Sequence, residues 1–348
     1  MINVSNTINF SDYIKKPEYN FLRDNEHLGD NVILLTLGGS YAYGMNKEGS
    51  DVDIRGIAFN SAKELLTYKD FEQVVDVPTD TTIYSVNKII TLLTSCNPNT
   101  IEMLGSKPEH YIKLTDAGKF LLDNKKLFLS KLAIHTFGGY ANAQLRRLEN
   151  KAARTISQAK NEEHILKTIN NAYYELKQRY ELQDINLYIG DSSRDDMEKE
   201  IFIDANFSHY PLRDWTGLWN ELKAIVSSFE KFGKRNKNAV THEKLSKHMA
   251  HLIRLYIMSI DILEKEDIIT YREDEHDLLM DIRNGKYLDS NQQPTTEFYE
   301  MLNEFEKRFD YAKENTSLPD KPNYKQIEEL RIMLNKYALE RSYHLGNF

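Results

Sequence analysis

Short apolar runs alternate with polar turns between about Val32 and Ile112. The clearest run is Val32–Leu37, which is rich in branched apolar side chains and is followed by two glycines, as is typical of a buried strand. Further apolar runs predict strands at residues 52–59, 73–77 and 81–84. Residues 61–66 and 85–95 have helical patterns. This part of the chain therefore predicts a unit built on a small sheet.

From about Asp116 onward the pattern is almost entirely helical. The predicted helical stretches lie at residues 120–145, 165–182, 215–232, 241–264, 296–312 and 324–343. Residues 186–214 interrupt them with Gly, Ser, Asp and Pro, and we predict a long loop or insertion there. The expected protein is α+β: a small mixed β-sheet domain at residues 1–120, followed by a helical C-terminal domain at residues 121–348.

Composition narrows the class of protein. The 348 residues are 41% hydrophobic and 28% charged, as in globular chains, with a net charge of −8 that argues against coating nucleic acid irrespective of sequence. The single cysteine, Cys96, excludes an intramolecular disulfide and a cysteine-rich zinc site. We find no apolar run of about 18 residues and no basic-then-apolar leader pattern. No membrane partner is therefore expected, and the cytoplasm is the expected location.

The segment between the first two predicted strands carries candidate chemistry. Val32–Leu37 ends in Gly38-Gly39-Ser40, and a helix is expected to begin at Tyr41. Free backbone N–H groups and a hydroxyl at such a junction can bind phosphate, and glycine lets the backbone approach it closely. Gly39 and Ser40 are therefore candidate ligands of a nucleotide's phosphates.

Two carboxylates follow this turn. Ten residues separate Ser40 from Asp51-Val52-Asp53. Because alternate residues of a strand share a face, Asp51, Asp53 and Arg55 are expected to point together. Adjacent carboxylates repel each other unless a cation lies between them, and Mg²⁺ prefers such oxygen ligands. Two Mg²⁺ ions, with Mn²⁺ as the alternative metal, would suit phosphoryl or nucleotidyl transfer.

Gly39-Ser40 and Asp51-x-Asp53, at this spacing, resemble the signature of nucleotidyltransferases of the DNA-polymerase-β superfamily. A narrower resemblance, to the RNA-repair-pathway polymerase-β family, extends over about residues 32–290. The segments that carry it are 39–44, 50–56, 97–104, 251–255 and 281–286. The resemblance implies transfer of a nucleotide, with an RNA end as acceptor.

The superfamily usually has a third acidic residue that binds metal and acts as base toward the acceptor hydroxyl. Asp80 is our candidate because it directly precedes the apolar segment Thr81–Tyr84. Asp76 is its rival, and Glu102 is a third possibility. Asp76 and Asp80 also flank Pro78, so either could simply be a turn residue.

Basic residues recur at helical spacing within residues 241–264. Lys247, His251 and Arg254 share one face of this predicted helix, and we expect them to meet nucleotide or acceptor phosphates. A solvated face is the simpler interpretation of such a stripe. Tyr43, beside the glycine turn, is a candidate for stacking on a nucleobase.

The leading hypothesis is a Mg²⁺-dependent enzyme that transfers a nucleoside monophosphate from an NTP to an acceptor hydroxyl and releases pyrophosphate. Asp51, Asp53 and Asp80 would be its metal ligands. The acceptor could be an RNA end, a protein hydroxyl or a small molecule. The alternative is a non-catalytic nucleotide- or RNA-binding protein that keeps the fold.

Overall fold

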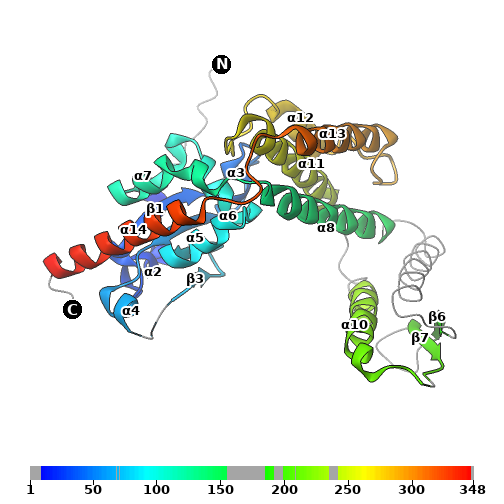
Figure 1. Cartoon of the computed structure of the whole chain (residues 1–348). Coiled ribbons are helices and arrows are strands. Elements are labelled where there is room, and N and C mark those ends of the chain that lie inside the picture. Colours follow the sequence, from blue (N-terminus) through cyan, green and yellow to red (C-terminus); the bar gives the residue numbers. More distant parts are fainter. Residues whose placement is uncertain are drawn as a thin grey trace, which may run out of the picture. The chain divides into compact units, whose positions relative to one another are not determined.

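A computed structural model of the chain describes residues 9–67, 69, 71–154, 185–191, 199–207, 209–234 and 242–345 (Figure 1). Internal contacts divide it into two units. The first comprises Met1–Leu145, Lys247–Tyr287 and Thr296–Phe348, and the second comprises Arg146–Ser246 and Leu288–Thr295. The fold class is α+β, as predicted. The predicted boundary at residue 120 falls inside the first unit.

A five-stranded mixed sheet organises the first unit. Its strands are β1 (Val32–Leu37), β2 (Ile54–Ala58), β3 (Gln73–Asp76), β4 (Thr81–Ser85) and β5 (Tyr111–Leu114). Their order is β3-β4-β2-β1-β5, and only the β2–β4 pair is parallel. All six residues of β1 are buried, as a central strand covered on both faces requires.

The helices of the first unit are mostly short in its N-terminal part and long in its C-terminal part. They are α1 (Phe10–Tyr13), α2 (Phe21–Asp24), α3 (Gly39–Ala42), α4 (Ala62–Leu66), α5 (Val86–Thr94), α6 (Pro98–Ile101), α7 (Asp116–Asp123), α8 (Leu132–Arg154, which continues into the second unit), α11 (His242–Lys265, whose first residues belong to the second unit), α12 (His276–Arg283), α13 (Thr296–Asn315) and α14 (Tyr324–Leu345). Short 3-10 turns lie at Pro17–Tyr19, Gly29–Asn31, Glu102–Gly105, Pro108–His110 and Lys125–Phe128.

Local sequence explains where the helices after the central strands begin. Ser61 and Glu64 form a capping box at the start of α4, and Ser85 caps α5 through the backbone N–H of Lys88. The C-terminal helix α14 packs against α4 and α5 (Figure 1). The last helix of the chain therefore supports helices that flank the N-terminal sheet.

In its described residues, the second unit contains an antiparallel hairpin and helix α10, besides the ends of α8 and α11. Strands β6 (Ile185–Asp191) and β7 (Lys199–Ala205) pair in register, and α10 (Leu212–Lys234) contacts β7. The prediction of a loop throughout residues 186–214 is therefore wrong for these strands. The strands contain alternating apolar residues, but the polar residues between these favoured the prediction of a loop. The helix predicted at residues 165–182 lies outside the described residues.

Candidate active site

The parallel pairing of β2 and β4 brings two aspartates together. Ile54 pairs with Thr81, so the residues that immediately precede these strands, Asp53 and Asp80, lie side by side. Their carboxyl groups share a hydrogen bond. Asp80 has a positive φ of 45°, a conformation that aspartate tolerates better than most residues. The sequence predicted Asp80 as a third carboxylate beside Asp51 and Asp53, and the sheet register supplies its contact with Asp53.

The charges around the pair affect the two carboxyl groups differently. Burial raises the pKa of Asp53 to about 6, with the hydrogen bond and negative charge of Asp80 adding to it and Arg55 and Lys247 opposing it. For Asp80, burial also acts to raise the pKa, but the hydrogen bond from Asp53 and the Arg55 charge outweigh it and lower the pKa below its ordinary value. Below about pH 6, Asp53 therefore holds a proton in the place where a cation would relieve the repulsion.

Arg55 fixes Asp80 from the neighbouring strand. Its Nη2 lies 3.2 Å from Asp80 Oδ1, and its Nη1 donates to the Asp80 carbonyl. Val52 and Ile54 are buried, whereas Asp53 and Arg55 are partly exposed, so the predicted alternation of faces holds here. The strand itself begins at Ile54, and Asp51 precedes it as an exposed residue.

The glycine turn packs directly against Asp53. Gly38 donates its backbone N–H to the Asp53 carbonyl at 2.8 Å. Gly39 has a φ of +53°, and a Cβ built on it would overlap the Asp53 carboxylate. Glycine is needed there because the backbone has a positive φ and because there is no space for a side chain. Ser40, the next residue, is half-buried in the first turn of α3.

Helix α11 carries the basic residues predicted to face this site. Lys247 is exposed, and its charge lowers the pKa of both Asp53 and Asp80. One turn further along, His251 is half-buried, and Arg254 is only 6% exposed. The described side chains of this stripe thus pass from solvent into the interior.

Arg254 is the centre of a buried cluster beneath the glycine turn. Its guanidinium carbon lies 3.3 Å from the centre of the Tyr43 ring, and its Nη2 donates to His251 Nδ1 at 2.6 Å. Its Nη1 lies 3.8 Å from Glu102 Oε2. Burial raises the pKa of Glu102 to about 8. Tyr43 is 3% exposed, so the structure places it and Arg254 under the turn, away from solvent.

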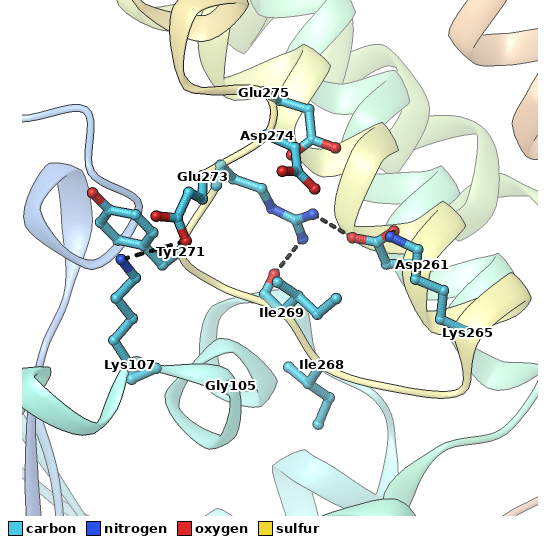
Figure 2. Close-up of a pocket in the computed structure, with 12 residues that line it drawn as sticks. Gly105, Lys107, Asp261, Lys265, Ile268, Ile269, Tyr271, Glu273, Asp274 and Glu275 are labelled. Carbon is cyan, nitrogen blue, oxygen red and sulfur yellow. Dashed lines mark hydrogen bonds and ion pairs between the residues drawn. The ribbon is translucent and has the colours of Figure 1, made fainter.

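Sequence analysis did not identify the segment that fastens this cluster, residues 268–272. Thr270 donates its hydroxyl to the Glu102 carbonyl at 2.6 Å, and Arg272 donates its backbone N–H to the Tyr43 carbonyl at 3.4 Å. The Arg272 guanidinium is buried against Asp261 and the Ile269 carbonyl (Figure 2). These residues have no periodic pattern of apolar positions. Most of their contacts are with residues distant in sequence, so the sequence contained no local signal for them.

A cavity of about 360 Å³ lies on this same segment. Lys107 is one of its lining residues, with its Nζ 3.4 Å from the centre of the Tyr271 ring and 3.9 Å from Glu273 Oε2 (Figure 2). A Cβ on Gly44 would clash with the Tyr271 ring. The end of the glycine turn is therefore held by the wall of this cavity.

The structure separates the three candidates for a third carboxylate. Asp80 adjoins Asp53. Asp76 instead accepts hydrogen bonds from the backbone and hydroxyl of Thr79, closing the turn before β4. Glu102 faces Arg254. Among the residues that the structure describes, no three acidic, histidine or cysteine side chains converge as a metal-type cluster, so Asp51 does not join the pair in this side-chain arrangement.

A mixed sheet that sets a Gly-Gly-Ser turn against paired aspartates is the arrangement implied by the resemblance to polymerase-β-type nucleotidyltransferases. Residues 16–178 match the model of the RNA repair pathway DNA polymerase beta family (RlaP). This match confirms the resemblance and supports a polymerase-β-like family for the chain. It includes the glycine turn, Asp53 and Asp80, whereas the motifs on α11 and α12 lie beyond it.

The family match suggests a nucleotidyltransferase with a role in RNA repair. No curated protein and no solved structure matches the chain. None of the helices in the described part of the chain combines the length and apolar character needed to cross a membrane.

Proposed function

We propose that the protein is a Mg²⁺-dependent nucleotidyltransferase that moves a nucleoside monophosphate from an NTP to an acceptor hydroxyl, with release of pyrophosphate. The observation that carries this proposal is the Asp53–Asp80 pair, which lies against the turn formed by Gly38 and Gly39. Two adjacent carboxylates repel each other unless a proton or a cation lies between them, which makes this pair suited to binding a metal ion.

The residues present suit Mg²⁺. The donors are all carboxylate oxygens. Burial, together with the neighbouring Asp80, raises the pKa of Asp53 to about 6, so above this pH two adjacent carboxylates repel each other unless a cation lies between them. Asp53 and Asp80 would hold the metal, with the exposed Asp51 turning toward them, and two ions are expected. Bound Mg²⁺ would stabilise the negative charge that develops on the phosphates during transfer.

The chain's own residues would supply the remaining steps. Gly39 and Ser40 would bind the outer phosphates of the NTP, and Asp80 would accept the proton of the acceptor hydroxyl. Arg55 orients Asp80, and Lys247 adds positive charge from α11. We assign Tyr43, His251 and Arg254 the task of holding the turn from below, since two of them are buried and in mutual contact.

The preferred acceptor is an RNA end, which the family match favours. The second candidate function is a nucleotide- or RNA-binding protein without transfer activity. The observation that favours this second function is the exposed position of Asp51, which leaves only two carboxylates in contact.

Transfer of label tests these functions. Each α-labelled NTP would be incubated with Mg²⁺ and with RNA, DNA or cell extract, using the wild-type protein, Asp51→Ala and Asp53→Ala. Glu48→Ala is the matched control, because it removes an exposed carboxylate from the same loop. We expect transfer that both aspartate variants lose and the control keeps.

Transfer that survives Asp53→Ala would show that the chemistry lies elsewhere. Mg²⁺-dependent binding of NTP without transfer to any acceptor would favour the binding protein.

A further inference from the structure

Both tryptophans of the chain lie on the same face of α10, in the second unit. Trp215 and Trp219 are one helical turn apart, their ring centres are 6.3 Å apart and the ring planes differ by only 10°. They are 38% and 47% exposed. Tryptophan is seldom left so open in pairs, because a ring of this size contributes strongly to stability when it is buried.

The packing of α10 does not need these exposed ring faces. Leu218, between the two tryptophans in sequence, is fully buried and supplies the inward contact of the helix. Phe207 packs edge-on against Trp215 at 5.1 Å, which fixes the orientation of that ring from the side. The two tryptophan rings are therefore held nearly parallel to each other and are partly exposed to solvent.

Positive charge accompanies the rings. Lys223 Nζ lies 5.6 Å from the centre of the Trp219 ring. Helix α10 itself contains four basic and three acidic residues, in a chain whose net charge is −8. The flanking Thr216 and Asn220 are polar and exposed, whereas Leu212 and Val226, which lie at helical spacing on the same side of α10, are exposed and apolar.

We propose that Trp215 and Trp219 are a stacking platform for unpaired bases of single-stranded RNA, with Lys223 at the backbone phosphate. Bases stack on exposed aromatic rings whatever their sequence, and nearby cations meet the phosphates. The role of this platform, holding the acceptor strand, rests on the proposed function. The binding itself does not.

The tryptophans report directly on this binding. A short unstructured oligouridylate would be titrated into the full-length protein without NTP, and tryptophan fluorescence would be recorded. We expect saturable quenching that weakens with added salt and is much weaker with duplex RNA, whose bases are already stacked. Absence of quenching at concentrations that saturate other single-strand binders would overturn the platform.

Substitutions locate the binding. Trp219→Ala keeps Trp215 as the reporter and should weaken binding by about 5-fold or more, whereas Trp219→Phe should retain most of it. Lys223→Gln should weaken binding less and reduce its salt dependence. Tyr311→Ala, which removes an exposed aromatic ring from α13, is the control and should bind as the wild type does.

Equal affinity of Trp219→Ala and wild type would contradict the proposal. So would self-association in sedimentation that Trp219→Ala abolishes, because the rings would then serve a second copy of the chain. Asp53→Asn should quench normally, so that failure of transfer and failure of RNA binding are observed separately.

Discussion

Two pairs of ionisable groups flank the glycine turn, and one pair is partly exposed whereas the other is largely buried. Asp53 and Asp80 lie at a partly exposed strand edge, within reach of the charges of Arg55 and Lys247. Glu102 and Arg254 lie in the interior, covered by Tyr43 and by the segment at residues 268–272. The first pair can be approached by a ligand from solvent, whereas the second is enclosed.

This difference in exposure indicates that the two pairs beside the glycine turn have different roles. Two like charges side by side are unfavourable until a cation arrives, so the open pair is suited to binding. A guanidinium stacked on a buried ring is stable without a ligand, so the closed cluster is suited to fixing the loop. We infer that exposure, more than residue type, separates the two carboxylates proposed to bind metal from the largely buried Glu102.

The largest expected effect comes from neutralising, one at a time, two of the three candidates for the third carboxylate. Asp80→Asn should lower kcat for transfer by about 10³-fold, which corresponds to about 4 kcal/mol of lost transition-state stabilisation. Glu102→Gln should leave kcat within about 10-fold of wild type, because a carboxyl group with a raised pKa is already largely uncharged. Steady-state kinetics would measure kcat for both variants. A larger loss of kcat in Glu102→Gln than in Asp80→Asn would contradict the assignment of Asp80 as the third carboxylate.

The next comparison tests whether a side chain at Gly39 is harmful because it lacks space or because the backbone there has a positive φ. Gly39 and Gly49 both have positive φ, of 53° and 78°, but only a side chain at Gly39 would meet the Asp53 carboxylate. Gly39→Ala should therefore lose transfer by about 10²-fold, the cost of displacing a metal-binding group. Gly49→Ala should cost only about 1 kcal/mol of unfolding free energy and keep its activity. Equal losses in both variants would show that strain alone matters.

The buried cluster around Arg254 should contribute to the free energy of unfolding. Arg254→Met removes the contact with the Tyr43 ring and the hydrogen bond to His251, and should lower the free energy of unfolding by about 2 kcal/mol. Lys247→Met removes an exposed cation from the same helix and should change it by less than about 0.5 kcal/mol. Denaturant titration would compare them, and similar values for the two variants would contradict a scaffold role for Arg254.

Local features of the sequence predicted Asp53 as a site residue and left Asp80 as the first of three candidates for a third carboxylate. Gly39, Asp53 and Asp80 adjoin strands whose apolar runs are recognisable, and the chemistry depends on residues next to those runs. Strand β5 was not predicted, because its four residues lie at a half-exposed edge and show no apolar run. Its pairing with β1 comes from tertiary structure.

The closed cluster could not be predicted in the same way. Lys247 and Arg254 look equivalent in sequence, as basic residues on one helical face, yet one is exposed and the other is 6% exposed. The difference arises because Glu102, Tyr43 and residues 268–272 gather around Arg254. Helical periodicity describes one helix, whereas burial depends on what packs against it.

The smallest expected effect would show whether the open pair is unfavourable without a metal. Because the pKa of Asp53 rises from 3.8 to about 6 in the folded protein, the native state binds this proton more tightly than the unfolded chain. The stability associated with it is present below about pH 4 and is lost as the pH rises to about 6. Asp53→Asn mimics the protonated group and should stabilise the metal-free protein above that range by about 1 kcal/mol, after allowance for solvent screening.

Thermal unfolding in a chelating buffer, at a pH below 4 and at a pH above 6, would measure this difference. Added Mg²⁺ should then stabilise wild type and leave Asp53→Asn nearly unchanged, because ligand binding to the native state raises its stability only where the site is intact. If the variant is instead less stable than wild type without metal at the higher pH, Asp53 is a structural acid like Glu102, and the contrast between the open and closed pairs fails.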